Sequence, residues 1–353
     1  MKLSGFILLV FVGAALYTPA KSQATSNIKD TITVIGVGDM MLGSGFPSAS
    51  HLPPNDDCDA LLKPVWHILQ NADVTFGNLE GCFLNSGPTT KKCSDPSRCY
   101  AFRMPDRYVH GYLNAGFDVV SLANNHSGDF GEAGRNNTMK LLDSVGINYG
   151  GLLVHPTASF MIDSVKYGFC AFAPNSGTCD VRDIVSAAEI VKKLKAENDI
   201  VIISFHAGAE GSSRQHVTRK TEEFIGENRG NVYEFAHSMI DAGADVLFGH
   251  GPHVTRAVEL YKERFIIYSM GNFCTYSQFN LAGVSGLAPI VKVFMNNKGE
   301  FLKAEVTPTI QVGEGGSNID SQKRVIKVIQ DLTATDFPEG VLNISNDGLI
   351  TKK

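Results

Sequence analysis

The sequence predicts an α/β protein with a parallel sheet at its centre. Apolar, β-branched runs alternate with helical stretches over much of the chain, as in strands joined by crossover helices. Further on, paired apolar runs flank short turns such as Asn297-Lys298-Gly299, which indicates added antiparallel hairpins. No linker, low-complexity block or repeat interrupts residues 25–353, so we expect a single domain over that range.

Each element is expected from its own residue pattern. Strands are predicted where Val, Ile, Phe and Thr cluster, and helices where apolar residues recur every three or four positions. The expected strands are residues 31–38, 72–77, 117–122, 199–205 and 245–248, with hairpins over 159–173, 258–269 and 290–307. The expected helices are residues 61–70, 106–115, 132–145, 183–197, 231–242 and 321–332.

The composition indicates a folded chain and excludes several classes of protein. Of the 353 residues, 43% are hydrophobic and 19% are charged, which is enough apolar material for a sizeable core and too little charge for disorder. The formal net charge is −5 and no basic stretch is present, so no nucleic-acid partner is expected. Collagen, coiled coil and multi-span membrane protein are excluded.

The N-terminus has the pattern of a secretory signal peptide. Lys2 precedes an apolar run over residues 6–17, and small residues follow it up to Ala24. The run is short for a membrane span, although an uncleaved N-terminal anchor remains the alternative. We therefore expect residues 1–24 to be removed and residues 25–353 to be exported to the periplasm or cell envelope of a bacterium.

Cysteine usage permits disulfides without making them the framework of the fold. The chain has 7 cysteines, and none has the spacing of a thiolate zinc site. Cys93 and Cys99 are the easiest pair to close. The next candidates are Cys58 with Cys82 and Cys170 with Cys179.

Polar, ligand-capable side chains follow five of the predicted strands at the point where each strand ends. Ligands of α/β proteins bind outside the carboxyl ends of parallel strands, so these side chains are expected to converge. The five clusters are Gly38-Asp39-Met40-Met41, Gly77-Asn78-Leu79-Glu80-Gly81, Ala123-Asn124-Asn125-His126, Ser204-Phe205-His206-Ala207-Gly208 and Gly249-His250-Gly251-Pro252-His253.

These clusters offer imidazole nitrogens with carboxylate and amide oxygens, a set that suits Zn²⁺, Mn²⁺ or Fe. More ligands are present than one tetrahedral ion needs, which suggests two ions bridged by a carboxylate that activate a water. Taken singly, each cluster has a plainer interpretation: Gly38-Asp39 as a turn, residues 124–126 as a helix cap, His206 as a buried structural histidine. Their shared place at strand ends favours one or two divalent ions.

In these motifs the sequence resembles the CapA family of poly-γ-glutamate capsule-synthesis proteins, a branch of the calcineurin-like metallophosphoesterases. The similar motifs are Gly-Asp-Met-Met-Leu, Gly-Asn-Leu-Glu, Ala-Asn-Asn-His, His-x-Gly-x-Glu, Gly-His-x-Pro-His-Val and Ser-Met-Gly-Asn-Phe, spread over residues 31–273. The resemblance implies a metallophosphatase-like α/β/β/α sandwich with two central mixed sheets. It also implies a bacterial envelope protein linked to the production or export of poly-γ-glutamate.

The resemblance carries roles to individual residues of this chain. It implies that the metal ligands are Asp39, Glu80, Asn125, His206, His250 and His253, and that His126 and Asn125 are catalytic. We expect Asn78, Asn124 and Glu210 to contact the substrate. Arg256 and Arg219 are candidates to hold an anionic substrate bidentately, with solvated surface charge as the alternative.

Three departures from the family pattern affect the site. Asp39-Met40-Met41 lacks the His of the usual Asp-x-His motif, and Asn78 stands where that superfamily has an Asp. Ala207 and Gly211 replace two aromatic residues, which predicts a wider pocket, covered by residues 85–100 and 212–229. The number of metal ions and phosphoesterase activity therefore stay open.

Two functions follow as alternatives. The first is a metal-dependent hydrolase of the envelope, acting on a phosphoester or related anionic substrate, with His126 donating a proton to the leaving group. The second is a non-catalytic accessory protein that binds the capsule polymer. The expected partners are an anionic polymer or small anionic substrate, together with membrane proteins of capsule synthesis.

Overall fold

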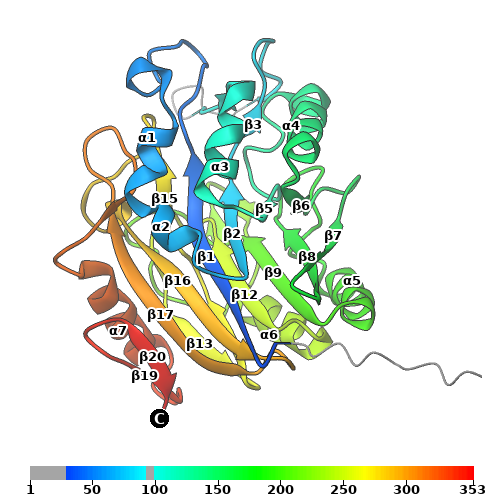
Figure 1. The fold of residues 1–353 in the computed structure, drawn as a ribbon, viewed down its shortest axis with the longest axis vertical. Coiled ribbons are helices and arrows are strands. Elements are labelled where there is room, and N and C mark those ends of the chain that lie inside the picture. Colours follow the sequence, from blue (N-terminus) through cyan, green and yellow to red (C-terminus); the bar gives the residue numbers. More distant parts are fainter. Residues whose placement is uncertain (1–28, 93–98) are drawn as a thin grey trace, which may run out of the picture.

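The computed structural model describes residues 29–92 and 99–353. Two β-sheets lie face to face, and helices cover the outer face of each sheet (Figure 1). This architecture confirms the predicted α/β/β/α sandwich with two central mixed sheets. The predicted signal peptide lies outside the described residues, and within the described ranges no helix has the length and apolarity that crossing a bilayer requires.

The larger sheet is built around its first strand, β1 (Thr31–Met41). On one side of β1 the neighbouring strands run parallel, and on the other side the long β16–β17 hairpin runs antiparallel, as expected from the sequence. Its other strands are β2 (Val74–Leu79), β5 (Val119–Ser121), β6 (Asn148–Gly150), β15 (Asn272–Thr275), β16 (Leu287–Asn296), β17 (Phe301–Ile310), β18 (Asn318–Ile319), β19 (Leu342–Ile344) and β20 (Leu349–Lys352).

The smaller sheet has a parallel centre and antiparallel edges. Strands β8, β9, β12 and β14 run parallel, while β7 and β13 close the two edges as hairpin partners. In sheet order these are β13 (Val258–Tyr261), β14 (Arg264–Ile267), β12 (Val246–His250), β9 (Ile200–His206), β8 (Val165–Phe172) and β7 (Thr157–Ile162). Two short pairs lie apart from the main sheets: β3 (Cys82–Phe83) with β4 (Arg103–Met104), and β10 (Glu223–Phe224) with β11 (Glu227–Asn228).

Helices pack their apolar faces on the outer faces of both sheets. The larger sheet is covered by α1 (Asp59–Leu62), α2 (Trp66–Leu69), α3 (Val109–Ala115) and α4 (Gly131–Val145). The smaller sheet is covered by α5 (Ile184–Glu197) and α6 (Val232–Ala242), and α7 (Arg324–Asp336) packs beside β16 and β17. Short 3-10 turns are η1 (Pro54–Asp56), η2 (Lys63–Val65), η4 (Asp106–Tyr108) and η5 (Gly283–Gly286).

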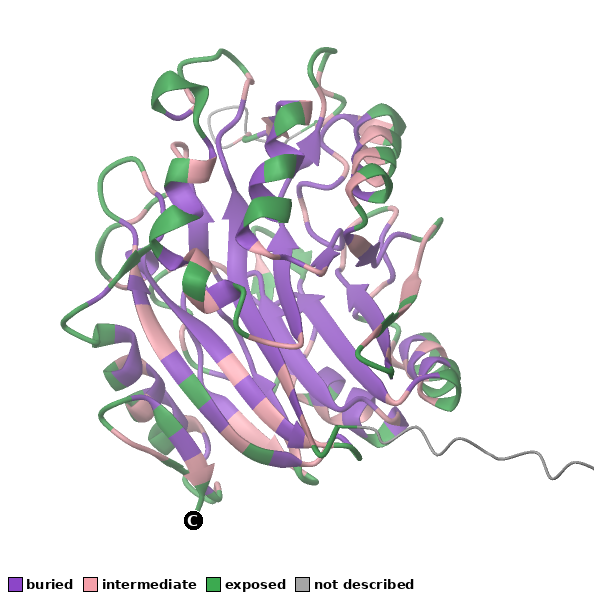
Figure 2. Ribbon diagram, viewed as in Figure 1, coloured by how far each residue is buried: buried purple, intermediate pink, exposed green. Residues whose placement is uncertain are grey.

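The main core lies between the two sheets, whose central strands are buried on both faces (Figure 2). Phe76 of the larger sheet places its ring centroid 5.4 Å from those of both Phe169 and Phe248 of the smaller sheet. Gly36 makes this close approach feasible, because a Cβ atom at that position would lie 2.3 Å from the Phe248 ring. Aromatic packing across a glycine thus fixes how the two sheets sit against each other.

The helix predicted over residues 61–70 is split into α1, η2 and α2. Pro64 lies at this break and has no backbone N–H to donate, so a continuous α-helical hydrogen-bond pattern cannot run through it. The predicted helix over 106–115 likewise begins as the 3-10 turn η4 after Pro105 and becomes α-helical only at Val109.

Two of the suggested disulfides are wrong. Cys58, Cys82, Cys170 and Cys179 are all buried free thiols, as is Cys274. Cys58 and Cys82 belong to separate apolar clusters, which explains why they do not pair. Cys99 is disulfide-bonded, and its suggested partner Cys93 lies outside the described residues.

Candidate metal centre

The carboxyl ends of strands from both sheets bring the predicted site residues together. In the larger sheet Asp39 of β1 lies beside Asn78 of β2, and in the smaller sheet His206 of β9 lies beside His250 of β12. The Phe76 ring, 5.7 Å from the His250 ring, packs directly beneath this junction. The remaining predicted ligands lie in the loops after their strands: Glu80 directly after β2, Asn125 four residues after β5 and His253 three residues after β12.

Asp39 is the hub of the cluster. Its Oδ1 accepts hydrogen bonds from Nδ2 of Asn78 at 2.8 Å and from Nδ1 of His250 at 3.1 Å, while its Oδ2 lies 3.1 Å from Nδ1 of His253. Burial opposes ionisation of this carboxyl, but the hydrogen bonds and charges of His250 and His253 hold its pKa well below the ordinary value. Asp39 is therefore a carboxylate at any physiological pH.

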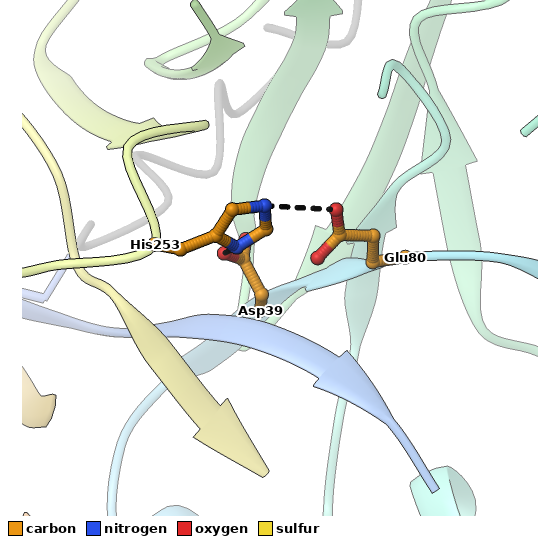
Figure 3. A group of neighbouring side chains, drawn as sticks. All are labelled: Asp39, Glu80 and His253. Atoms are coloured by element: carbon orange, nitrogen blue, oxygen red, sulfur yellow. Dashed lines mark hydrogen bonds and ion pairs between the residues drawn. The ribbon is translucent and has the colours of Figure 1, made fainter. Parts of the chain in front are cut away.

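Glu80 and His253 face each other across the centre of the cluster (Figure 3). Nε2 of His253 lies 3.7 Å from Oε1 of Glu80, and ligand atoms of Asp39, Glu80 and His253 all lie within 4.8 Å of one another. Burial and the nearby Asp39 charge raise the pKa of Glu80 to about 8. Burial alone would lower the pKa of His253, but Glu80 and Asp39 outweigh it and raise that pKa to about 10.

Several buried polar atoms at this place have no hydrogen-bond partner among the residues that the structure describes. They are both carboxylate oxygens of Glu80, Oδ1 of Asn125, and Nε2 of His206 and of His250. Each unpaired buried acceptor typically costs about 1–3 kcal/mol, so their gathering at one point needs an explanation. In the neutral tautomer of His250 whose Nδ1 donates to Asp39, Nε2 carries the lone pair that a metal ion needs. The donor set and these unpaired atoms fit a divalent cation.

His206 contributes a neutral imidazole to the cluster. Burial lowers the pKa of its side chain well below the ordinary value, and the positive charge of Arg229 adds to this effect. A neutral imidazole is the form of histidine that binds metal ions. Its Nδ1 makes only a loose contact, 3.4 Å from Nδ2 of Asn78.

Asn78 and Asn124, expected to contact the substrate, lie buried beneath the ligands instead. Asn124 Nδ2 donates to Oδ1 of Asn78 at 3.2 Å and to the carbonyl of Leu79 at 2.8 Å. This fixes the orientation of the Asn78 amide, whose NH₂ group then points to Asp39. Asn124 also accepts from the backbone N–H of His126 at 3.0 Å, so both residues position neighbouring side chains.

His126 stands at the edge of the cluster, with its Nε2 4.0 Å from Oε1 of Glu80. Its Nδ1 donates to Oδ2 of Asp129 at 2.7 Å, and its ring stacks on Phe102 at a centroid distance of 4.0 Å. Burial lowers the pKa of His126, and Asp129 opposes that change. The imidazole is thus held with Nε2 facing the cluster.

Three polar residues next to the site were not among the candidates from sequence. Lys91 places Nζ 2.9 Å from Oδ1 of Asp129, and Oδ1 of Asn272 lies 3.0 Å from Nδ1 of His253. Asn272 belongs to the Ser-Met-Gly-Asn-Phe motif and Asp129 follows the Ala-Asn-Asn-His motif by three residues, so both could have been found from the motifs. Lys91 lies 38 residues before Asp129 along the chain, and no local pattern relates the two.

A cavity of about 670 Å³ opens above the cluster. His126, His253, Asn125 and Asn272 form part of its lining, with Lys91, Lys92 and Tyr100 from one predicted covering segment and Ser212, Phe224, Ile225, Glu227 and Arg229 from the other. Glu210, expected to contact substrate, lines the cavity and pairs with Nη2 of Arg229 at 2.8 Å. The cavity therefore has polar groups at its base and aromatic and charged groups around them.

Arg256 does not reach this cavity. It is fully buried, with its guanidinium donating to both oxygens of Glu222 at 2.9 and 2.8 Å and to the carbonyls of Arg214 and Ala209. Arg219 lies over the rings of Tyr233 and Phe337 and pairs with Glu339. Both arginines are occupied by other residues of the chain, so the structure does not bring them to the site.

The chain is similar to proteins of a known family. The profile of a family described as bacterial capsule synthesis protein PGA_cap matches residues 33–277. The capsule biosynthesis protein CapA of Bacillus anthracis is 25% identical over 286 residues, which cover 76% of this chain and 65% of that protein. The PGA biosynthesis protein CapA of Bacillus subtilis is 25% identical over 296 residues, covering 76% and 70%. The chain thus spans less than two thirds of the B. anthracis protein.

Among solved structures, a 5′-nucleotidase precursor from Thermus thermophilus aligns with a TM-score of 0.43 and 13% identity. The alignment covers 85% of this chain and 59% of the nucleotidase.

Proposed function

The chain belongs to the bacterial capsule synthesis protein family PGA_cap, and from that membership and the site we propose a metal-dependent hydrolase of the cell envelope that acts on the anionic polymer poly-γ-glutamate or on an anionic precursor of it. Export rests on the signal-peptide pattern of residues 1–24. Membrane proteins of capsule synthesis are the partners that this function calls for.

One observation carries the metal part of this proposal. Both carboxylate oxygens of Glu80 are buried without a partner among the described residues, and ligand atoms of Glu80, Asp39 and His253 lie within 4.8 Å of one another. Asn125, His206 and His250 each add a further buried atom without a partner in that part of the chain. We assign one or two divalent cations, Mn²⁺, Zn²⁺ or Fe²⁺, to these six residues, since mixed nitrogen and oxygen ligands suit all three metals. Such a cation supplies Lewis acidity toward a substrate oxygen and lowers the pKa of water.

Residues of the chain handle the proton in this proposal. The acid is the imidazolium form of His126: Nδ1 donates to Asp129 at 2.7 Å, the transferable proton is at Nε2, which faces the cluster, and the Asp129 carboxylate stabilises this form. Donation from this position to the leaving group is general acid catalysis. Asn125 lines the cavity beside His126, and its amide oxygen has no partner in the part of the chain that the structure describes.

A second function, polymer binding without catalysis, is favoured by Asn78. Its NH₂ group points toward Asp39 and Oδ1 of Asn78 is taken by Asn124, so Asn78 offers no free oxygen to a second ion. A carboxylate at this place would have offered one. The side chains therefore offer enough ligands for one ion more readily than for two. A site with one ion can bind an anionic polymer without hydrolysing it.

Elemental analysis of the purified protein, paired with hydrolysis assays, separates the two functions. The assays use a phosphodiester and poly-γ-glutamate, each with and without Mn²⁺ or Zn²⁺. Metal in the protein together with metal-dependent turnover supports the hydrolase. Metal and polymer binding with no turnover support the binding protein, and absence of metal after reconstitution contradicts both.

A further inference from the structure

We propose that Arg229 forms a carboxylate-binding subsite at the wall of the cavity, where it takes a free carboxylate of the substrate beside the group held at the metal centre. This inference rests on the proposed function and names the chemical group that the substrate must carry. It gives to Arg229 the part that the sequence had suggested for Arg256.

The backbone holds Arg229 firmly at the cavity. Its N–H donates to the carbonyl of Glu222 at 2.8 Å, and its own carbonyl accepts from Gly208 at 2.9 Å. Gly208 comes two residues after His206, so the backbone of Arg229 is tied to the strand end that carries a predicted ligand. The positive charge of Arg229 contributes to the lowered pKa of His206, as expected for two neighbouring groups.

The guanidinium of Arg229 has donors to spare. Arginine carries five N–H donors, yet its partners among the described residues are Glu227 through Nη1 and Glu210 through Nη2. The side chain is only 3% exposed, so solvent does not pair with Nε, and no described residue accepts a hydrogen bond from it. A guanidinium that is paired this incompletely has donors left for a further carboxylate.

The two acidic partners of Arg229 are held very differently. Glu210 is 20% exposed and pairs at 2.8 Å, whereas Glu227 is 64% exposed and pairs at 3.3 Å. An ion pair to so exposed a side chain contributes little and exchanges readily with solvent. Glu227 also lines the cavity. An incoming carboxylate can therefore replace Glu227 on the guanidinium while Glu210 keeps it in position.

The chemistry of the guanidinium selects the class of ligand. Its planar fork matches a planar carboxylate, which can accept two parallel N–H bonds. A γ-linked glutamate chain keeps a free α-carboxylate beside every amide bond. A substrate of this kind offers one group to the metal centre and a neighbouring carboxylate to Arg229, whereas a simple phosphodiester offers only one anionic group.

Calorimetric titration of the Mn²⁺-loaded full-length protein tests the subsite with two dipeptides. γ-Glutamylglutamate carries the second α-carboxylate, and γ-glutamyl-4-aminobutyrate lacks only that group. We expect the wild type to prefer the first by roughly ten- to hundred-fold, as for a charged hydrogen bond. Arg229→Gln should abolish the preference. Arg182→Gln, a neighbouring arginine that does not line the cavity and pairs with Asp180 on the surface, should keep it.

Glu227→Gln gives a test that does not depend on removing the arginine. Because Glu227 competes for the guanidinium, its neutral variant should bind γ-glutamylglutamate about two- to five-fold more tightly. Equal affinity of the wild type for the two dipeptides overturns the subsite, as does weaker binding by Glu227→Gln. Metal content is measured on the same samples. A protein that holds Mn²⁺ but binds neither dipeptide contradicts the subsite alone, and one that holds no metal contradicts the proposed function.

Discussion

The carboxyl group of Glu80 lies 3.7 Å from Nε2 of His253, and no residue in the described ranges donates a hydrogen bond to either of its oxygens. Because the pKa of each residue is raised, Glu80 and His253 are both protonated near neutral pH when no metal is bound. Protonated His253 lies between the Asp39 carboxylate and the carboxyl group of Glu80 and provides the positive charge itself. A divalent cation that enters must displace these protons, so metal binding and pH are linked.

The metal-free protein should lose stability as pH rises. The pKa of Glu80 is raised from 4.5 to about 8, so its contribution is complete below pH 4.5 and is lost as pH rises through 8. The pKa of His253 is raised from 6.5 to about 10, so its contribution is complete below pH 6.5 and is lost as pH rises through 10. Thermal melting in EDTA from pH 5.5 to 9 checks this.

Glu80→Gln is the matched variant for that experiment. It keeps the shape of the protonated acid and removes the titration, so the fall of Tm with pH should become shallower. Mn²⁺ should raise the Tm of the wild type most at high pH and leave the variant little changed. A wild-type Tm in EDTA that is flat or rises from pH 5.5 to 9 would show that the two raised pKa values are absent.

His126→Asn should reduce turnover by about 10²–10⁴-fold while metal content stays near the wild-type value. The reason is that the imidazolium form of His126, which Asp129 stabilises, presents its Nε2 proton toward the cluster while Nδ1 donates to Asp129. Turnover and bound metal are measured on the same preparation. A joint fall of both would make His126 a metal ligand.

Arg256→Met should destabilise the fold by about 3–5 kcal/mol, because it leaves the carboxylate of Glu222 buried without its partner. Replacing both residues with apolar ones should restore much of the loss. Chemical denaturation measures the change, and Arg182→Gln serves as the control because its ion pair is exposed. A loss under about 1 kcal/mol for Arg256→Met, the range of an exposed ion pair, would show that Arg256 is not a structural residue.

Gly36→Ala should destabilise the protein by about 1–3 kcal/mol through overpacking between the sheets. The new Cβ would lie 2.3 Å from the Phe248 ring, which is itself fixed by stacking on Phe76. Gly45→Ala is the control, since its nearest neighbouring atom would be 3.7 Å away. Equal denaturation midpoints for the two variants would contradict this account of sheet packing.

Much of the fold and the meeting of the predicted ligands could be derived from the sequence, because both depend on local order along the chain. Asp39, His206 and His250 lie at or near the carboxyl ends of their strands and Glu80 directly follows its strand, and parallel strands bring such positions to the same edge of a sheet. Where prediction failed locally, as over residues 61–70, a single residue, Pro64, accounts for it.

The partners of charged side chains could not be derived in this way. Arg256 follows His253 closely in sequence, yet its guanidinium is taken by Glu222 from a distant segment, while Arg229 reaches the cavity. Lys91 meets Asp129 only because a long loop folds back on it. Such pairs depend on how distant segments pack together, and this packing cannot be predicted from residue type and spacing.

The central claim is that the buried cluster holds a divalent metal ion. Elemental analysis of the wild type and of His250→Ala, each reconstituted with Mn²⁺, Zn²⁺ or Fe²⁺ and freed of loose ions, tests it most directly. We predict one or two ions per wild-type chain and a clear loss in His250→Ala, with a matching loss of metal-induced thermal stabilisation. Equal metal content in the two proteins, or no metal in the wild type, would contradict the claim.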